Sequence, residues 1–459
     1  MELLIIIVFV LGYLAITLEH TLKIDKLIPA LLMMALLWAM VALGLPDFTD
    51  WFSSAEHALV DGFSLLDKEH KLHWLEESVL HHLGKTAEIL FFLVGAMTIV
   101  EIIDYFDGFA TFKKLITTTS KTNLLWIFAS LAFILSAIID NLTATIVLIT
   151  ILQKIIHDRT TRLWFACLIV IAANAGGAWS PIGDVTTTML WIAKKVTTPK
   201  LIMYLIIPSL LCMAVPTFVA SFLKPFKGNI PPPNEESRKG SKSPHGQTML
   251  ILGLLGIIFV PIFKTVTHLP PYIGMMLSLG VVAMFAEIYS RSEFTLSSIK
   301  EQDHEDAHGF HSPVHKSLSR IELPSVLFFL GILMAVAALE SLGILFKAAD
   351  GLQAAIPNTN VVVMLLGVGS AVVDNVPLVA ASIGMFQQGQ DHLLWHFIAY
   401  SAGTGGSMLI IGSAAGVVAM GMEKIDFFWY LKNITWLAAL GFISGAVYFI
   451  ILYGSQVLI

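Results

Sequence analysis

The chain has 459 residues, of which 56% are hydrophobic and 13% are charged, and its mean hydropathy is +0.80. This composition excludes a water-soluble globular enzyme and is typical of a polytopic membrane protein. The formal net charge of −6 gives no indication of a nucleic-acid partner, and the two cysteines lie in apolar runs, so we expect no disulfide framework.

Apolar runs of span length follow one another along the chain. A hydrocarbon core of about 30 Å needs roughly 20 apolar residues in a helix. Ten runs approach this length, at residues 3–18, 27–45, 89–105, 163–192, 201–223, 248–263, 272–289, 323–339, 393–420 and 431–453. The first lacks a positively charged leader and a small-residue cleavage site, which predicts a retained helix rather than a signal peptide. We therefore predict an all-α polytopic membrane protein.

Two further apolar stretches carry an Asp-Asn pair at their centre. SAIIDNLTATIVLI (residues 136–149) and SAVVDNVPLVAASI (residues 370–383) share the order Ser, Ala, two β-branched residues, Asp and Asn. The apolar run on either side of each pair is shorter than a full span, which predicts two re-entrant hairpins. The hairpins are expected over about residues 124–156 and 360–388, with Asp140, Asn141, Asp374 and Asn375 at their tips.

The two halves of the chain resemble each other beyond these hairpins. LFFLVGAM (residues 90–97) matches LFFLGILM (residues 327–334), and ANAGGAWSPIGD (residues 173–184) aligns with AGTGGSMLIIGS (residues 402–413). An odd number of predicted crossings separates the copies, so they have opposite orientation, as in many secondary transporters. The glycine-rich segments predict unwound turns inside spans, where backbone lines a wet cavity or is buried in protein. Broken transmembrane helices are expected over about residues 163–193 and 393–420.

The chain is thus expected to be organised as two inverted repeats joined by linkers. The predicted divisions are N-terminal transmembrane helices at 1–45, an outer polar loop at 46–87, the first repeat at 88–223, a cytoplasmic linker at 224–246, transmembrane helices at 247–289, a His-rich cytoplasmic linker at 290–322 and the second repeat at 323–459. An amphipathic helix is expected within the outer polar loop. If each hairpin returns to the face that it entered, most of the 27 Lys and Arg residues fall on one face. Because cytoplasmic loops are rich in Lys and Arg, both termini are expected outside.

Carboxylates at membrane depth are the strongest functional candidates, because each costs at least a few kcal/mol unless it is protonated, paired or bound to a cation. Asp140 and Asp374 occupy this depth at the two tips. The alternative is that each only caps the second helix of its hairpin. Because Asn141 and Asn375 could cap these helices alone, we favour binding of a cation or proton by the aspartates.

A third carboxylate follows the first glycine-rich break. Asp184 begins the polar run DVTTT, and its counterpart in the second half is Ser413, so the repeats are not chemically equivalent. Capping of a half-helix that begins at Val185 is the alternative role. We expect a Na⁺ site in the region of Asp140, Asp184 and Asp374.

Neutral oxygen donors accompany these carboxylates. Those expected at the same site are Thr143, Asn174, Ser180, Ser401, Thr404 and Ser407, with Ser136, Thr145 and Ser370 nearby. Hydrogen bonding within a packed core is the alternative role for them. Glu101, Asp104 and Glu340 lie near the ends of spans and are secondary candidates for a proton path, although a carboxylate at a span end is more often simply hydrated.

One motif points to different chemistry. HEDAH (residues 304–308) fits the H-E-x-x-H zinc pattern, and His311 and His315 follow it at helical spacing. The motif lies in a polar linker, whereas a zinc protease needs a packed helix. We therefore expect no zinc and interpret the segment as a solvated linker, with a cytoplasmic pH-responsive element as the alternative.

The residue types at the predicted tips and breaks favour a cation as the transported ion. Oxygen ligands from Asp, Asn, Ser and Thr suit hard cations, and no Lys or Arg lies near a break to hold an anion. A carboxylate that binds either Na⁺ or H⁺, but not both, produces exchange when the site faces the two sides of the membrane in turn. The sequence therefore indicates a cation/proton antiporter that needs no cofactor.

The motifs themselves resemble a known family. IIDNLTAT and VVDNVPLV, together with NAGGAWSPIGDVTTTM and SAGTGGSMLIIGSAAG, resemble the NhaD family of sodium/proton antiporters from about residue 88 to the C-terminus. The resemblance implies a homodimer in a bacterial cytoplasmic membrane, with a scaffold part and an elevator-like transport part that carries Na⁺, or Li⁺, and H⁺. It also implies binding roles for Asp140, Asn141, Asp184, Asp374 and Asn375.

Two other functions stay open as alternatives. Dicarboxylate carriers of the same superfamily have Ser-Asn-Thr where this chain has Asp-Asn, so a carrier of arsenite, a dicarboxylate or another anion is the less favoured transport function. An intramembrane zinc protease using His304 and His308 is the remote alternative.

Overall fold

The computed structural model describes residues 1–17, 22–53, 58–113, 118–230, 245–297, 312–345, 347, 351, 355–372 and 375–457. Within these ranges nine helices are long and apolar enough to cross a membrane. The predicted all-α polytopic fold is confirmed, with one small exception: β1 (Phe52–Ser53) and β2 (Ala58–Leu59) form a short antiparallel pair before the first long helix.

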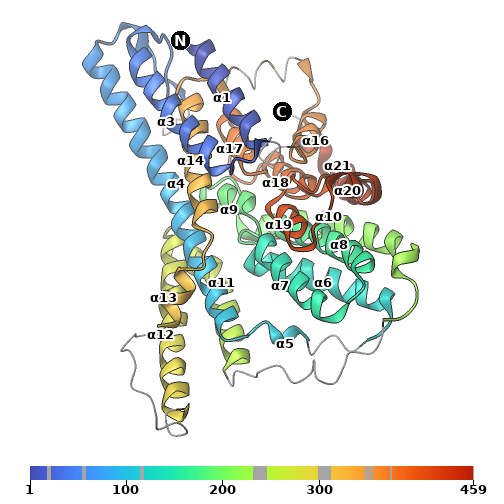
Figure 1. Ribbon diagram of the computed structural model, residues 1–459. Coiled ribbons are helices and arrows are strands. Elements are labelled where there is room, and N and C mark those ends of the chain that lie inside the picture. Colours follow the sequence, from blue (N-terminus) through green and yellow to red (C-terminus); the bar gives the residue numbers. More distant parts are fainter. Residues whose placement is uncertain are drawn as a thin grey trace.

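The helices divide into two groups that lie side by side (Figure 1). We call the first group the slab. It consists of α1 (Glu2–Thr17), α3 (Leu27–Gly44), α4 (Lys68–Tyr105), α11 (Gly246–Thr267), α12 (Pro271–Ser297), α13 (Pro313–Leu318) and α14 (Leu323–Ser341). Its main contacts join α3 to α14 and α12 to both α4 and α11. At 1.5 Å per residue, the 38 residues of α4 extend about 57 Å, so this helix is much longer than a hydrocarbon core.

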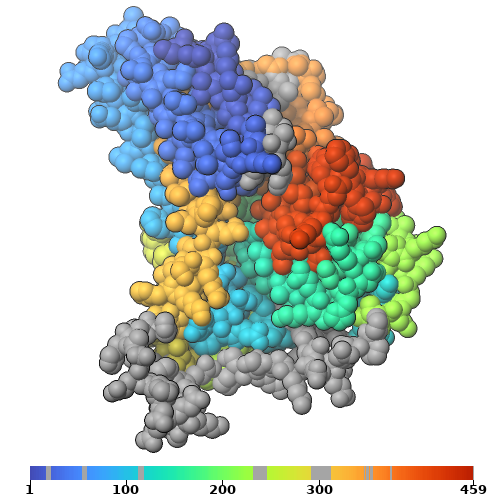
Figure 2. Space-filling model, viewed as in Figure 1, coloured from blue at the N-terminus to red at the C-terminus, as the bar shows by residue number. Residues whose placement is uncertain are grey.

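The second group, which we call the hairpin body, contains both predicted hairpins and both predicted broken helices. It consists of α6 (Lys121–Ile139), α7 (Asn141–Ile155), α8 (Arg159–Gly177), α9 (Val185–Ile192), α10 (Thr198–Ser221), α16 (Thr359–Gly369), α17 (Asn375–Met385), α18 (Leu393–Gly405), α19 (Ala414–Glu423), α20 (Phe427–Asn433) and α21 (Thr435–Val457). Figure 2 shows its green and red surface beside the blue and yellow surface of the slab. The two groups touch mainly where α14 meets α17, and also where α4 meets α9 and α11 meets α6.

The first hairpin returns to the end from which it starts. The ammonium group of Lys121, at the start of α6, donates to the hydroxyl of Thr161 at 3.3 Å. The guanidinium of Arg162 donates to the carbonyl oxygen of Ile156, just after α7, at 3.2 Å. Thr161 and Arg162 both lie in the first turn of α8, so the two open ends of the α6–α7 hairpin meet there. The two helices therefore form a hairpin with its turn at Asp140. Only α7 is shorter than a span as predicted, because α6, with 19 residues, is among the helices long enough to cross a membrane.

The second hairpin is built from shorter helices. α16 and α17 have 11 residues each, or about 16 Å of helix, which is too short to cross a hydrocarbon core. Asp374 at the predicted tip lies outside the described residues, and α17 begins directly after it at Asn375.

Both broken helices repeat the same local geometry. α8 ends at Gly177 and α9 begins after Asp184, whereas α18 ends at Gly405 and α19 begins after Ser413, with the 3-10 turn η5 (Gly406–Met408) between them. The N-cap torsions are φ −150° and ψ 146° for Asp184, and φ −147° and ψ 151° for Ser413. The alignment of Asp184 with Ser413 in the sequence therefore corresponds to an equivalence in the structure.

Glycine makes the close contact between hairpin and broken helix possible. A Cβ added to Gly176 would lie 2.2 Å from the carbonyl oxygen of Phe133, and one added to Gly405 would lie 2.0 Å from that of Gly367. Real carbon–oxygen contacts are never this short, so only glycine fits at both positions. Close approach of backbones at small residues is a general feature of helix packing in membranes.

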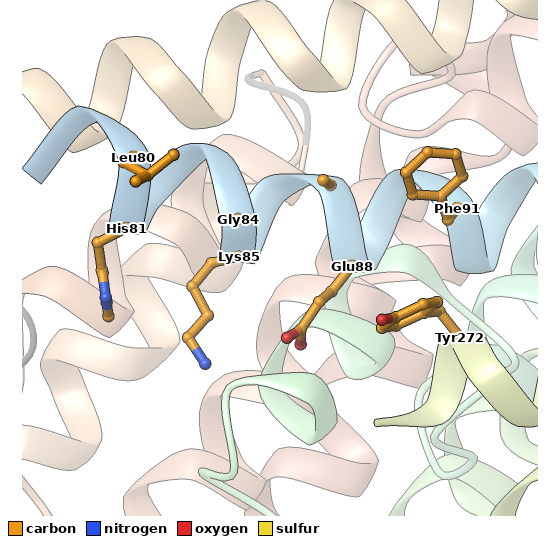
Figure 3. Close-up of a pocket in the computed structure, with 8 residues that line it drawn as sticks. Leu80, His81, Gly84, Lys85, Glu88, Phe91 and Tyr272 are labelled. Atoms are coloured by element: carbon orange, nitrogen blue, oxygen red, sulfur yellow. The ribbon is translucent and has the colours of Figure 1, made fainter. Parts of the chain in front are cut away.

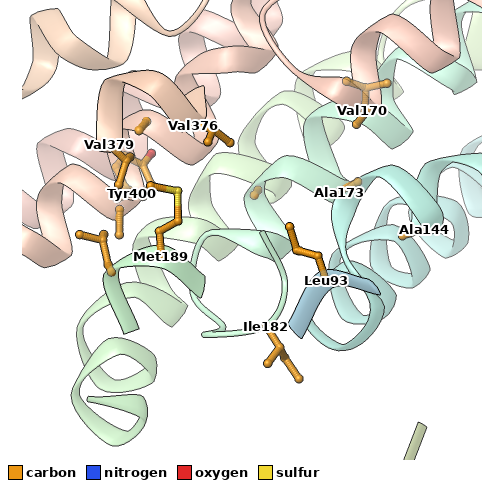
Figure 4. Close-up of a cluster of buried hydrophobic side chains, with 14 of the residues drawn as sticks. Leu93, Ala144, Val170, Ala173, Ile182, Met189, Val376, Val379 and Tyr400 are labelled. Carbon is orange, nitrogen blue, oxygen red and sulfur yellow. The ribbon is translucent and has the colours of Figure 1, made fainter. Parts of the chain in front are cut away.

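An apolar layer surrounds the point where hairpins and broken helices meet (Figure 4). Its side chains come from α4, α7, α8, the first break, α9, α17 and α18, and include Leu93, Ala144, Val170, Ala173, Ile182, Met189, Val376, Val379 and Tyr400. All of these are buried. Polar groups inside this layer are therefore shielded from lipid and must find partners within the protein.

Two of the predicted loop segments contain ordered structure. The first half of α4 lies in the outer polar loop, where an amphipathic helix was expected, and Asp67 caps this helix by accepting from the backbone N–H of His70 at 2.9 Å. Part of the predicted linker at 224–246 is also ordered, since Ile230 donates to the carbonyl oxygen of Thr119 at 2.8 Å. Residues 231–244 of that linker lie outside the described ranges.

Candidate functional site

Asp140 forms the turn between α6 and α7. Its φ of 95° lies in the region that favours glycine, a conformation that costs a non-glycine residue on the order of 1–3 kcal/mol. One carboxylate oxygen accepts from the backbone N–H of Thr143 at 2.8 Å, and the other accepts from the Thr143 hydroxyl at 2.9 Å. The predicted capping role is therefore present, and the half-buried carboxylate faces its own helix.

Asp184 lies at the centre of the polar groups that converge between the breaks. Its Oδ1 accepts from the backbone N–H and the hydroxyl of Thr186, both at 2.8 Å, so it caps α9. Its Oδ2 accepts from the Asn141 amide at 2.7 Å. The Asn375 amide approaches both oxygens, at 3.4 and 3.5 Å. A single carboxylate, only 2% exposed, is thus contacted by the tips of both hairpins.

Asn174 connects the two repeats. Its carbonyl oxygen accepts from the Asn141 amide at 3.0 Å, and its own amide donates to the hydroxyls of Ser407 and Ser413, both at 2.9 Å. The two hydroxyls belong to the second break, whereas Asn174 belongs to α8. A continuous hydrogen-bonded path therefore runs from Asp184 through Asn141 and Asn174 to the second repeat.

The predicted residues divide into those within this path and those beside it. The path contains Asn141, Asn174, Asp184, Asn375 and Ser407. Thr404 donates to a carbonyl of its own helix at 2.6 Å, and the Ser180 hydroxyl accepts from the Ile182 N–H at 3.4 Å inside the first break. Ser401 and Thr145 are buried, and their hydroxyls have no hydrogen-bond partner in the part of the chain that is described.

Ser136 and Ser370 have a shared structural role. The Ser136 hydroxyl donates to the carbonyl oxygen of Ala173 at 2.6 Å, and the Ser370 hydroxyl donates to that of Ala402 at 3.0 Å. Each serine thereby fastens a hairpin to the broken helix of its own repeat.

The secondary candidates lie away from the path. Glu101 and Asp104 are in the last turns of α4, and Glu340 is near the end of α14, where its carboxylate lies against Gly384 of α17. Of the His-rich segment, His304, His308 and His311 fall outside the described residues, and His315 is in α13. Among residues with a described position, no group of three His, Cys, Asp or Glu side chains could hold a metal ion.

Sequence reasoning missed two contributions to this region. Tyr430 of α20 is fully buried and donates its hydroxyl to the carbonyl oxygen of Ser407 at 2.7 Å. Arg162 donates to both oxygens of Glu423 at 2.7 and 2.8 Å, and Gln153 donates to the same carboxylate at 3.0 Å. The ion pair joins α8 to α19, and the hydrogen bond from Gln153 adds α7. Because these residues are far apart in the sequence, no local sequence pattern indicates that they meet.

The local electrostatics combine carboxylates with helix N-termini. The N-cap residues of α7, α9 and α19 lie in this region and are Asp140, Asp184 and Ser413, and α17 begins at Asn375. The positive ends of four helix dipoles therefore point toward a small volume that holds the carboxylate of Asp184. Within the described chain, no Lys or Arg side chain hydrogen-bonds to these residues. Oxygen atoms of Asp, Asn, Ser and backbone are suitable ligands for a hard cation or a proton.

Comparison with known proteins connects this geometry to a family. The sequence model described as citrate transporter matches residues 6–397. The chain is 40% identical to sodium/proton antiporter 1 of Arabidopsis thaliana, over 96% of this chain and 70% of that one. It is 31% identical to the Na⁺/H⁺ antiporter NhaD of Alkalimonas amylolytica, over 93% of this chain and 86% of that one.

A solved structure shares the fold. The crystal structure of the YdaH transporter of Alcanivorax borkumensis aligns with a TM-score of 0.60 over 94% of this chain and 99% of that chain. The sequences are only 12% identical, so the likeness concerns the fold alone.

Proposed function

Since this chain belongs to the citrate transporter family and, within it, to the NhaD-type sodium/proton antiporters, we propose that it exchanges Na⁺ for H⁺ across a membrane. The observation that carries the proposal is the buried Asp184 carboxylate, which accepts hydrogen bonds from the amides of both hairpin tips. The donors that reach it from the described residues are amide, hydroxyl and backbone N–H groups, and a buried carboxylate is stabilised further by a bound cation or by a proton. Competition between the two at one carboxylate couples their movements.

We assign Asp184 the central binding role and Asp140 a supporting one. Asp184 has hydrogen-bond partners in α7, α9 and α17. A change in the charge of its carboxylate therefore alters hydrogen bonds to helices of both repeats. Asp140 is hydrogen-bonded to Thr143 through both oxygens, and it would have to turn away from the cap to coordinate an ion fully. Asn141, Asn174 and Ser407 supply neutral oxygens around the centre. Asp374, at the second tip, is proposed as the corresponding carboxylate of the second hairpin.

The two groups of helices suggest how the site changes sides. We propose that the hairpin body moves as a unit against the slab, in an elevator-like manner. The ion pair between Arg162 and Glu423 and the hydrogen bonds of Asn174 join the two repeats inside the hairpin body, whereas contacts to the slab are confined to a few helix pairs. A homodimer formed through the slab, a bacterial cytoplasmic membrane, outward-facing termini and transport of Li⁺ are further parts of the proposal.

One observation favours a second function. Four helix N-termini meet at the site, an arrangement that also binds anions, and the matching family model is described as citrate transporter. A citrate-like substrate would be repelled by the Asp184 carboxylate, and no Lys or Arg of the described residues hydrogen-bonds to that carboxylate through its side chain to offset the repulsion. Uptake of labelled citrate by proteoliposomes, with no cation-dependent proton movement, would support this alternative.

The main test is proton movement in proteoliposomes on addition of Na⁺, Li⁺ or K⁺ between pH 6 and 9. If Na⁺ and H⁺ compete, the apparent affinity for Na⁺ should weaken as pH falls, by up to about tenfold per pH unit for each proton that must leave. Asp140→Asn should retain the helix cap but weaken exchange and make this pH dependence shallower. An Asp140→Asn protein with wild-type exchange and an unchanged pH profile would show that Asp140 is only a cap. Asp158→Asn, at the exposed cap of α8, is the matched control.

A further inference from the structure

The half-helix α9 has the Asp184 carboxylate at one end and a side chain of the slab at the other. Its eight residues extend about 12 Å from this N-cap residue. Near its C-terminal end, the ammonium group of Lys264, from α11 of the slab, donates to the carbonyl oxygen of Trp191 at 2.9 Å. The last carbonyls of a helix lack a partner in a following turn, and the helix dipole favours a cation there. Lys264 therefore caps α9 from outside the hairpin body.

The side chain of Trp191 is enclosed by the same surface of the slab. The ammonium group of Lys264 lies 4.1 Å from the centre of the indole ring, within the range of a cation–π interaction. Phe92 of α4 contacts this ring edge to face, with 6.3 Å between the ring centres and 79° between the ring planes. Trp191 is only 2% exposed. Two helices of the slab thus hold one residue of α9, through its backbone and through its ring.

A carboxylate of the slab keeps the Lys264 ammonium group in place. Glu88 of α4 attracts this ammonium group, whereas Lys194, just after α9, repels it. Figure 3 shows the Glu88 side chain extending from α4 beside Tyr272, where it lines a pocket of about 420 Å³. Because Glu88 and Lys264 both belong to the slab, their attraction does not depend on the position of the hairpin body. The cation therefore stays with the slab, and α9 is the partner that can leave.

The equivalent half-helix of the second repeat is capped from within the hairpin body. At the C-terminal end of α19, the guanidinium of Arg159 donates to the carbonyl oxygen of Lys424 at 3.1 Å, and that of Arg162 pairs with Glu423. Both arginines lie in the first turn of α8. The two half-helices thus have equivalent N-caps but receive their C-terminal cations from different groups of helices. A movement of the hairpin body against the slab would break the contact at α9 and keep the contact at α19.

We propose that Lys264 and Phe92 form a latch on Trp191, which holds the hairpin body in the conformation described here and releases α9 in each transport cycle. The proposal rests on the elevator-like movement proposed above. Lys264 is a positioning residue, because it binds the end of α9 opposite to Asp184 and acts on the ion only through the place of this half-helix. The latch also makes the two repeats unequal in mechanics, since the second half-helix has no corresponding contact to break.

Pulsed electron paramagnetic resonance between spin labels on the two groups of helices tests the latch. The labels are attached through Gly84→Cys in the slab and Gly389→Cys between α17 and α18, because both glycines are exposed and a Cβ at either meets no atom within 4 Å. The native cysteines, Cys167 and Cys212, are buried. Protein with only one label identifies distances between copies of the chain. In lipid nanodiscs, Lys264→Met should shift the ratio of the two slab-to-body distance populations about tenfold against the described conformation, as the loss of a hydrogen bond from a charged group predicts.

Two matched variants separate the latch from a general loss of stability. Lys264→Arg keeps a cation that can donate to the Trp191 carbonyl and stack on its ring, so it should keep the wild-type ratio. Arg159→Met removes the corresponding hydrogen bond at α19 and should leave the ratio unchanged, because both partners move together. Thermal unfolding in detergent verifies that each variant is folded.

The possible failures of the latch and of the exchange proposal are distinguishable. An unchanged ratio in Lys264→Met, or an equal shift in Arg159→Met, would overturn the latch. Wild-type protein that moves protons in response to Na⁺, but shows the same distance distribution in every variant, would remove the latch and leave the exchange proposal in place. Wild-type protein without Na⁺-dependent proton movement in proteoliposomes would contradict the proposed function itself.

Discussion

The two repeats of the hairpin body have matching geometry but different chemistry. Asp184 and Ser413 share nearly the same backbone torsions and cap equivalent half-helices, but one brings a carboxylate and the other a hydroxyl. The carboxylate receives amides from both hairpins, whereas the Ser413 hydroxyl accepts from Asn174 and from the N–H of Gly416. The backbone fold thus places an N-cap residue at the same position in each repeat. The type of that residue, Asp or Ser, decides which repeat has a negative charge there.

The largest effect on exchange is expected when the N-cap residues Asp184 and Ser413 are substituted and compared. Asp184→Asn keeps the size of the side chain but removes the charge, so Na⁺-dependent proton movement in proteoliposomes should fall at least about 100-fold, or roughly 2.7 kcal/mol. Ser413→Ala, at the equivalent position, should reduce it only several-fold because it removes two neutral hydrogen bonds and no charge. Equal losses in the two variants would show that charge at position 184 is not the basis of exchange.

Glycine substitutions should affect the two repeats alike. Gly176→Ala and Gly405→Ala would each place a methyl group within about 2 Å of a backbone carbonyl oxygen. We expect each to lower the free energy of unfolding by about 1–3 kcal/mol, measured by thermal or chemical unfolding in detergent. Gly421→Ala is the control, because a Cβ there meets no atom within 4 Å. A large effect in only one repeat would contradict the structural equivalence.

Substitution of the two hairpin asparagines should weaken Na⁺ binding to different extents. The Asn141 amide is 2.7 Å from Asp184, whereas the nearest distance from Asn375 is 3.4 Å. Asn141→Ala should therefore weaken apparent Na⁺ affinity by about tenfold, and Asn375→Ala by about threefold. These factors correspond to the free energy that a hydrogen bond to a charged group usually contributes. The measurement is the Na⁺ concentration at half-maximal exchange. A stronger effect of Asn375→Ala would mean that the second hairpin holds the ion more tightly than this conformation indicates.

The smallest expected effect concerns the serines that fasten the hairpins. Ser136→Ala and Ser370→Ala each remove one buried hydrogen bond to a carbonyl of the neighbouring broken helix. Each should reduce stability by about 1 kcal/mol, seen as a small fall in unfolding temperature, while exchange stays close to wild type. A loss of exchange without a loss of stability would indicate that these hydroxyls contact the ion.

Much of the fold could be predicted because membrane insertion depends on local composition. Eight of the ten apolar runs coincide with helices of the described chain that are long and apolar enough to cross a membrane; the ninth such helix is α6, which was predicted as a short arm of a hairpin. The Asp-Asn pair located the turn of the first hairpin, since α6 ends at Ile139 and α7 begins at Asn141. The glycine-rich segments likewise coincide with the ends of α8 and α18. A helix was expected in the outer polar segment, but its continuation into the crossing as one helix of 38 residues was not predicted, because the hydrophobic signal begins only at the crossing.

The sequence by itself determined which segments lie in the membrane, where they break and which of them carry carboxylates. Only the tertiary structure decided the partner of each polar side chain: Asp140 faces Thr143 of its own helix, whereas Asp184 receives the amides of two hairpins that are distant in sequence. The same holds for Arg162 and Glu423, which meet across the repeats. The physical reason is that transfer into the membrane is a property of each segment alone, whereas a hydrogen bond or ion pair depends on how the segments pack.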